Sequence, residues 1–197
     1  MRKIKILEHI SLDGVISPGE QGEYSHDFTH GGWTTQYRSP AGLEAVIEAQ
    51  GNNFDLLLGR RTYDLWTGFW PKAGNTPIAN SLNGATKYVV THRPDGLEWG
   101  PVGNLGADVI AGIRNLKSTD GPDLIVWGSS TLTPVLLDQG LVDEVVLIVY
   151  PVLLGRGKRF FSDSVDPREL AFVSTRTMPT GALVNTYKYV GALRTES

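Results

Sequence analysis

Cysteine is absent from this sequence of 197 residues. Its absence excludes disulfide bonds, thiolate nucleophiles, iron–sulfur clusters and cysteine-based zinc sites, and it favours a reducing compartment, so we expect a cytoplasmic protein. Long hydrophobic runs are also missing. The longest uncharged apolar stretch, Val145 to Gly155, is far shorter than the roughly 20 residues that cross a bilayer, and the N-terminus is too charged for a signal peptide. We therefore expect no membrane partner.

A strong excess of charge of either sign is lacking too. The chain has 18 Lys and Arg residues against 21 Asp and Glu residues, which gives a net charge of -3. Nothing in this balance indicates binding to nucleic acid. The hydrophobic fraction of 41% and the charged fraction of 20% are those of an ordinary globular protein. The length predicts a single domain over residues 1–197.

Strands and helices are expected to alternate along the chain. Apolar runs predict strands over 4–10, 53–59, 86–91, 123–127 and 144–152, and helical spacing predicts helices over 41–50, 107–117 and 133–139. A hairpin is expected at the C-terminus, with strands over 170–177 and 184–190. The fold class predicted is a three-layer α/β domain with a mostly parallel central sheet and an antiparallel C-terminal hairpin. Such sheets bind ligands at the carboxyl ends of their strands.

Three of these strand ends carry groups suited to an anion. Gly59-Arg60-Arg61-Thr62 offers a close backbone approach, two guanidinium groups and a residue able to cap the next helix. Thr91-His92-Arg93 ends the next strand, and Gly128-Ser129-Ser130-Thr131 opens a helix after the third. Three arginines exceed what a pyrophosphate needs and suit an additional 2′-phosphate, so the sequence favours NADPH over NADH.

A long loop between the first strand and Pro40 contains the segment His26-Asp27-Phe28-Thr29-His30. Histidines four residues apart are typical of zinc proteases, but Asp27 replaces the expected glutamate. No long apolar helix surrounds the segment and no third ligand is evident, so we expect no metal. The same loop contains Trp33, a candidate for stacking on a flat heterocycle, as Trp66 and Trp70 also are.

Taken together, these segments resemble the dihydrofolate reductase superfamily, in particular the reductase domain of bacterial riboflavin biosynthesis and its stand-alone relatives. The residues that carry the resemblance are Ser11-Leu12-Asp13-Gly14-Val15-Ile16, Gly59-Arg60-Arg61-Thr62-Tyr63, Lys87-Tyr88-Val89-Val90-Thr91 and the block from Leu124 to Phe161. That block includes Trp127-Gly128-Ser129-Ser130 and Pro151-Val152-Leu153-Leu154-Gly155-Arg156-Gly157. The resemblance spans nearly the whole chain.

The resemblance implies a sheet that binds NADPH and a hydride transfer to a pteridine-like or pyrimidine-like heterocycle. By this analogy Gly59, Arg60, Arg61 and Thr62 contact the phosphates on the adenosine side, and Thr91, His92 and Arg93 flank the 2′-phosphate. Gly128, Ser129, Ser130, Thr131 and Leu132 lie against the pyrophosphate and nicotinamide, over which Val15 and Ile16 close. The resemblance also implies a homodimer.

Hydride transfer asks few side chains of the protein, because the cofactor carries the chemistry. Asp13, Glu44 and Trp33 are the candidate catalytic residues: the two carboxylates orient the substrate and the indole stacks on it. Three alternatives stay open. They are dihydrofolate reduction, a nucleotide-binding module without turnover, and a hydrolase whose serine follows Trp127 with His92 as its base.

Overall fold

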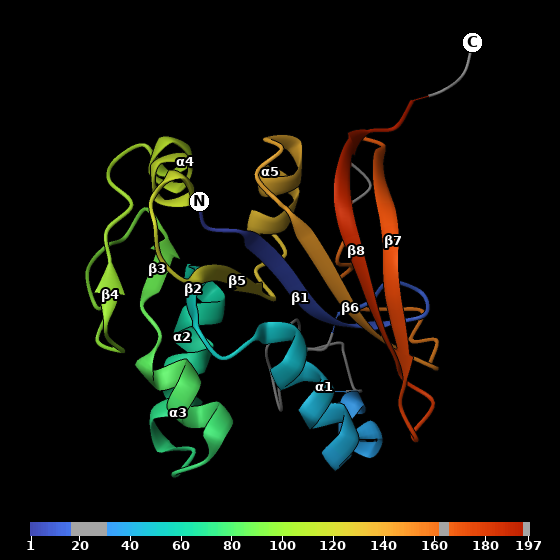
Figure 1. Cartoon of the computed structure of the whole chain (residues 1–197). Coiled ribbons are helices and arrows are strands. Elements are labelled where there is room, and N and C mark those ends of the chain that lie inside the picture. Colours follow the sequence, from blue (N-terminus) through green and yellow to red (C-terminus); the bar gives the residue numbers. More distant parts are fainter. Residues whose placement is uncertain (17–30, 162–165, 195–197) are drawn as a thin grey trace. The chain divides into compact units, whose positions relative to one another are not determined.

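The computed structural model describes residues 1–16, 31–161 and 166–194 (Figure 1). The chain forms two compact units. The first contains Met1–Ile6 and Gln50–Asp143, and the second contains Leu7–Ala49 and Glu144–Ser197. The strand β1 (Ile4–Ser11) therefore begins in the first unit and ends in the second.

The first unit alternates strands and helices. Its elements after β1 are β2 (Phe54–Gly59), α2 (Arg60–Phe69), the short 3-10 helix η2 (Trp70–Lys72), α3 (Pro77–Gly84), β3 (Lys87–Val90), β4 (Val102–Gly103), α4 (Val109–Ser118), β5 (Asp123–Trp127) and α5 (Leu132–Asp138). β2 pairs in parallel with both β3 and β5, and β3 pairs in parallel with β4. Figure 1 shows α2 and α3 on one face of these strands and α4 and α5 on the other.

Helices on both faces explain the apolar character of β2 and β5. Leu56, Leu57 and Leu58 are fully buried, as are Leu124 to Val126. A parallel strand covered on both sides has no solvent face, so its sequence is continuously apolar rather than alternating. β3 departs from the expected burial on both faces, because Tyr88 and Val90 are only half-buried.

The second unit contains the rest of β1, the 3-10 helix η1 (Trp33–Tyr37), most of α1 (Pro40–Gln50), β6 (Glu144–Tyr150), β7 (Arg168–Thr177) and β8 (Leu183–Ala192). β8 pairs antiparallel with both β6 and β7, so the chain closes in a hairpin. α1 is tied to β7 by Arg176, whose guanidinium lies 2.8 Å from a Glu48 carboxylate oxygen.

The hydrogen-bonded order of the strands is β4-β3-β2-β5-β1-β6-β8-β7. The predicted fold class is confirmed: a mostly parallel sheet carries helices and an antiparallel hairpin at its C-terminal end. In the described residues, no helix combines the length and the apolar character that crossing a membrane requires.

Candidate functional site

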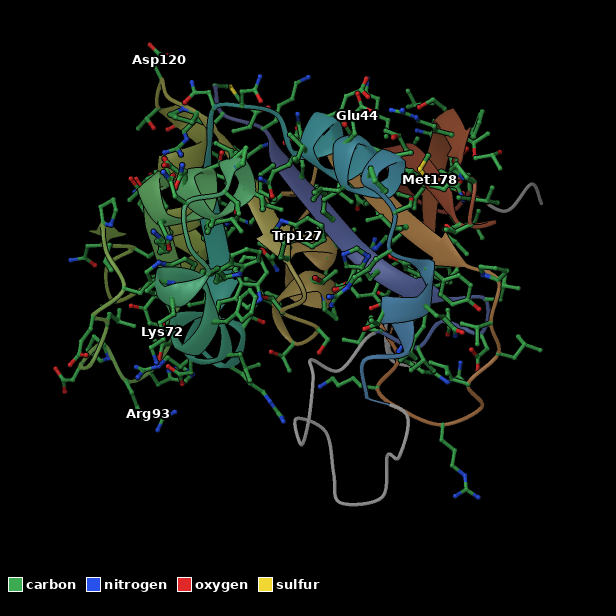
Figure 2. The ribbon with its side chains drawn as sticks, turned by 90° about the horizontal axis from the view of Figure 1, so that it is seen from below. Glu44, Lys72, Arg93, Asp120, Trp127 and Met178 are labelled. Atoms are coloured by element: carbon green, nitrogen blue, oxygen red, sulfur yellow. The ribbon has the colours of Figure 1, made fainter. Side chains whose placement is uncertain are left out.

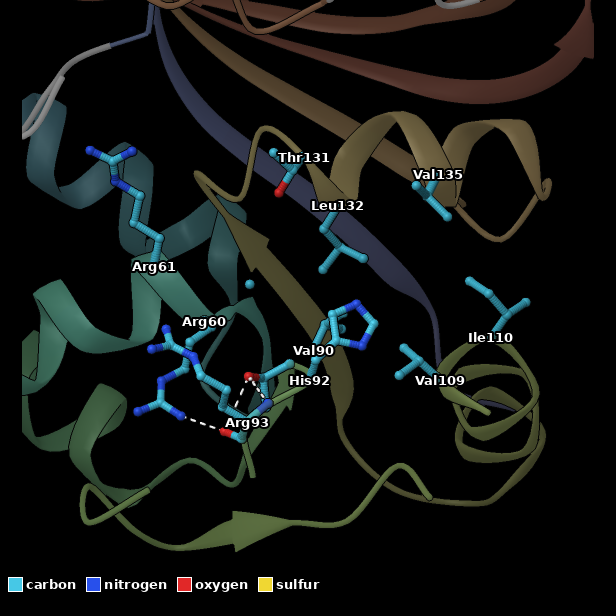
Figure 3. A pocket seen from close by; sticks show the side chains of 12 residues that line it. Arg60, Arg61, Val90, His92, Arg93, Val109, Ile110, Thr131, Leu132 and Val135 are labelled. Carbon is cyan, nitrogen blue, oxygen red and sulfur yellow. Dashed lines mark hydrogen bonds between the residues drawn. The ribbon is translucent and has the colours of Figure 1, made fainter. Parts of the chain in front are cut away.

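The carboxyl ends of β2, β3 and β5 open on one pocket of the first unit (Figure 3). Its volume is about 480 Å³, which lies within the range of small-molecule and cofactor sites. The lining residues are Gly59, Arg60, Arg61, Val90, Thr91, His92, Arg93, Val109, Ile110, Thr131, Leu132 and Val135. The three segments singled out in the sequence therefore meet, although Thr62, Gly128, Ser129 and Ser130 are not among the residues that line the pocket.

The pocket has two chemically distinct parts. Figure 3 shows Arg60 and Arg93 together at one end and Val109, Ile110 and Val135 toward the other. The guanidinium groups offer donors to phosphate oxygens, and the aliphatic wall offers apolar surface to a ring. A ligand that fits both parts is anionic at one end and apolar at the other. The aliphatic wall from α4 and α5 was not part of the predicted site.

The guanidinium of Arg60 forms hydrogen bonds with other residues of the chain. Its Nε donates to Asp64 at 2.7 Å, and its Nη1 donates to the carbonyl oxygens of Arg93 at 2.5 Å and Asp95 at 2.9 Å. The turn that it holds is further fixed by Thr91, whose hydroxyl oxygen accepts the amide of Arg93 at 2.9 Å. The structure thus places Arg60 where it sets the position of the segment that carries Arg93. The Arg93 side chain itself is exposed and extends from the surface (Figure 2).

The turn after β5 has an unusual backbone. Gly128 and Ser129 both have positive φ, 55° and 50°, a conformation that costs a serine free energy. Hydrogen bonds compensate for this cost. The Ser129 hydroxyl donates to the Trp127 carbonyl and accepts the Gly59 amide, both at 2.9 Å, and the Ser129 amide donates to the Thr62 hydroxyl at 3.1 Å. Ser129 therefore fastens the end of β5 to the end of β2.

These contacts correct one detail of the sequence interpretation and bear on the hydrolase hypothesis. Thr62 does not cap a helix: α2 begins at Arg60, after Gly59. The hydroxyl of Ser129 is buried and bonded to the backbone, and the serine that the hydrolase hypothesis would use as nucleophile is its neighbour Ser130. In the described residues the hydrolase hypothesis has no arrangement of serine and histidine to support it, because His92 contacts neither Ser129 nor Ser130 through any hydrogen bond found there.

The remaining candidates lie in the second unit. The carboxylate of Asp13 accepts the Ser11 hydroxyl at 2.6 Å and the amides of Leu154 and Gly155 at 3.1 and 2.6 Å. Desolvation opposes ionisation, but these hydrogen bonds prevail and lower the pKa of Asp13 to about 2. Asp13 thus joins the turn after β1 to the loop after β6. Its carboxylate is occupied by these contacts.

Replacing Asp13 with asparagine is expected to lower the free energy of unfolding at neutral pH. Below pH 5, the free energy of unfolding of the variant is expected to depend less on pH than that of the wild type. The folded-state pKa lies below its ordinary value of 3.8, so the ionised carboxylate stabilises the fold above that value and loses this effect as the pH falls through about 2. Urea unfolding at several pH values measures the difference between the two proteins. It should shrink from pH 5 to pH 2, whereas a constant difference would contradict the assignment. Asp166→Asn is a matched control, because that carboxylate is exposed.

Glu44 does not line the pocket of the first unit described above. Its side chain is 74% exposed on α1 (Figure 2), and its carboxylate lies 3.7 Å from the Arg176 guanidinium of β7. Val15 and Ile16 are buried instead. Val15 forms a β-bridge with Arg159, and the Ile16 amide donates to the carbonyl of Lys158 at 2.9 Å, so these two residues belong to a backbone framework.

Trp33 belongs to an aromatic cluster that the sequence did not indicate. Its ring packs edge-on against Tyr150 with centroids 5.3 Å apart, and Tyr37 contacts the same ring at 5.3 Å. The Tyr150 hydroxyl lies 2.9 Å from Nδ1 of His9. His9 and Tyr150 stand near the carboxyl ends of β1 and β6, where the rule on strand ends directs a search for ligands. That rule was the available signal, but both residues were assigned only to buried strands.

Metal-binding groups of three or more His, Cys, Asp or Glu side chains are not found among the residues that the structure describes. His26 and His30 lie outside those residues.

Comparison with known proteins identifies relatives across the chain. Residues 2–184 match the family of the RibD C-terminal domain. The uncharacterized protein YyaP of Bacillus subtilis is 29% identical over 145 residues, which cover 71% of this chain and 77% of that protein.

The solved structures that share the fold include the following two. A diaminohydroxyphosphoribosylaminopyrimidine deaminase/5-amino-6-(5-phosphoribosylamino)uracil reductase of Thermotoga maritima aligns with a TM-score of 0.65 and 15% identity, over 96% of this chain and 57% of that one. Dihydrofolate reductase from Enterococcus faecalis, complexed with NADP(H), aligns with a TM-score of 0.56 and 17% identity over 94% of both chains.

Proposed function

This chain belongs to the RibD C-terminal domain family, and from that premise we propose that it is an NADPH-dependent reductase of a pyrimidine-type or pteridine-type heterocycle. The observation that carries the proposal is the pocket of the first unit, where guanidinium groups and an aliphatic wall meet at three strand ends. Family membership supports an oxidoreductase role. The dihydrofolate reductase with the same fold is complexed with NADP(H), which supports the cofactor.

The residues of the pocket fit a phosphorylated dinucleotide. Arg93 and His92 are exposed at its edge and Thr91 fixes the turn that carries them, so this segment is proposed to hold the 2′-phosphate. Gly59 is the N-cap of α2 and offers no side chain to cap it, so the amides of the first turn are suited to a second phosphate. Val109, Ile110 and Leu132 offer apolar surface to a ring.

When bound, NADPH supplies the hydride. The chain's own work is then to bind phosphate through Arg93 and the first turn of α2, and to keep the ends of β2 and β5 together through Ser129. None of these tasks requires a covalent intermediate with the protein. The small number of reactive side chains in the described pocket is therefore consistent with the proposed reaction.

Calorimetric titration with NADPH and with NADH tests the cofactor, and NADPH is expected to bind at least tenfold more tightly because only it carries the 2′-phosphate. Equal affinities would contradict the assignment of Arg93. The reaction is tested by following NADPH oxidation with pterins and with ribityl or ribosyl aminopyrimidine phosphates. Saturable NADPH binding without oxidation by any of these compounds would instead support a nucleotide-binding module.

Dihydrofolate reduction is the weaker alternative. The resemblance to that branch implies an acidic residue on the first helix that binds the ring, but the two acids of α1, Glu44 and Glu48, are both exposed and paired with Arg176. Oxidation of NADPH by dihydrofolate at a rate comparable to that with the best aminopyrimidine would reverse this preference.

A further inference from the structure

The cluster around Tyr150 joins aromatic rings and polar groups near the ends of two strands. His9 near the end of β1 and Tyr150 at the end of β6 share a hydrogen bond of 2.9 Å. Trp33 and Tyr37, both from η1, pack on the Tyr150 ring. His9 and Tyr37 are half-buried, so the cluster reaches the surface of the second unit.

Trp33 adds an unused donor to this cluster. Its side chain is 7% exposed, and its indole N–H has no hydrogen-bond partner within the described part of the chain. A buried donor that makes no hydrogen bond destabilises the folded protein. Such a group in a native protein requires an explanation, and a ligand that accepts the bond is one.

The ionisation of the cluster defines what it can bind. Burial, with a contribution from Arg38, lowers the pKa of His9 to about 4, and burial raises the pKa of Tyr150 to about 12 even though Arg38 lowers it. Both side chains are therefore neutral at physiological pH. A neutral imidazole and a phenol each donate one hydrogen bond and accept another. The positive charge of Arg38 makes a protonated ring less favourable here.

We propose that His9, Tyr150 and the indole N–H of Trp33 recognise the hydrogen-bonding edge of a neutral lactam ring. A lactam edge alternates carbonyl oxygens with N–H groups, so it requires donors and acceptors side by side and no counter-charge. The inference rests on the proposed function, because it assigns to the second unit the residues that select the heterocycle. His9, Tyr150 and Trp33 are specificity-determining residues in this assignment.

The test uses lumazine, a pteridinedione, and 2,4-diaminopteridine, which offers a different hydrogen-bonding edge. In protein labelled with ¹⁵N on tryptophan, five indole signals are expected, and the Trp33→Phe variant assigns that of Trp33. Lumazine is expected to shift the Trp33 signal. The signals of Trp127 and Trp99 should stay in place, because these indoles already donate to Gln50 and Asn83. An unshifted Trp33 signal at saturating lumazine, or failure of lumazine to bind, would overturn the proposal.

Conservative variants test the contacts one at a time. Tyr150→Phe removes only a hydroxyl and is expected to weaken lumazine binding about three- to tenfold. Tyr187→Phe is the matched control, because that half-buried tyrosine lies on β8 and contacts Phe172 instead. Lumazine should bind more tightly than 2,4-diaminopteridine to the wild type, and Tyr150→Phe should narrow the difference. Equal losses in the two tyrosine variants would contradict the assignment.

NADPH affinity separates this inference from the proposed function. The pocket of the first unit contains none of the three residues, so Tyr150→Phe and Trp33→Phe are expected to bind NADPH as the wild type does. Absence of NADPH binding in the wild type would contradict the proposed function. Normal NADPH binding together with a Trp33 indole that does not respond to lumazine would contradict this inference alone.

Discussion

Replacing Arg93 with alanine is expected to remove most of the preference for NADPH over NADH. The guanidinium is exposed at one end of the pocket, and the turn beneath it is fixed by Thr91. A charge-assisted contact with a phosphate is worth enough that its loss should weaken NADPH binding by about ten- to a hundredfold and leave NADH nearly unchanged. Calorimetry with both nucleotides measures the effect, and it should weaken as salt is added.

Two further arginine variants make this experiment specific. Arg114→Ala removes an exposed guanidinium of α4 that bonds Gln139, and it should leave both nucleotide affinities unchanged. Arg93→Lys keeps the charge without the planar fork and should retain part of the preference. An Arg93→Ala variant that lost NADPH and NADH affinity equally would show that Arg93 supports the pocket rather than the 2′-phosphate.

Arg60 is expected to act on the same phosphate through Arg93. Its bonds to the carbonyl oxygens of Arg93 and Asp95 would be lost in Arg60→Ala, and the turn would lose its position. The two substitutions should therefore be non-additive, with the double variant little worse than Arg93→Ala. Full additivity would instead indicate that Arg60 binds phosphate independently.

Gly112→Ala is expected to lower the free energy of unfolding by roughly 1 to 3 kcal/mol, because α4 packs directly against a neighbouring backbone. A Cβ at residue 112 would overlap the carbonyl group of Leu105, and a backbone atom has little room to move aside. α4 would have to shift, and it carries Val109 and Ile110 of the pocket. Chemical denaturation should report the loss, and NADPH binding should weaken with it.

Gly68→Ala offers the opposite result from the same chemical change. Gly68 lies within α2, where no atom comes within 4 Å of an added Cβ. Alanine favours the helix there and is expected to stabilise the protein by about 0.5 to 1 kcal/mol. Equal decreases in the free energy of unfolding for Gly112→Ala and Gly68→Ala would contradict the role of close packing at Gly112.

Strands were predicted well where burial dominates the sequence. The predicted strand 123–127 coincides with β5, because its four apolar residues, Leu124 to Trp127, form a continuous buried run. Helices were predicted less completely, and α3 was missed. Its residues include Asn80, Ser81, Asn83 and Gly84, which disfavour helix interiors, although Thr76 caps it and Pro77 occupies its first turn as the usual start signal. Tertiary packing of Ala79 and Leu82 stabilises it instead.

The pocket could be predicted from the sequence only as far as strand order allows. Gly59 ends β2, and Thr91 and Thr131 follow the neighbouring strands β3 and β5, so parallel pairing brings the three together at one edge. The hydrogen bond from Arg60 to the Arg93 carbonyl could not be predicted, because it depends on the path of the chain between β3 and β4. The contact between His9 and Tyr150 joins residues 141 positions apart, and no local pattern marks it.

Four of the five tryptophans lie in the first unit and one lies in the second, so the fluorescence of the two units can be separated. The ring centroid of Trp66 lies within 6.4 Å of those of Trp70, Trp99 and Trp127, all in the first unit, so the tryptophan fluorescence of that unit comes from four neighbouring indoles. Trp33 is alone in the second unit. In a Trp33→Phe variant, tryptophan fluorescence follows the unfolding of the first unit alone. The difference between the wild-type and variant spectra then follows the unfolding of the second unit.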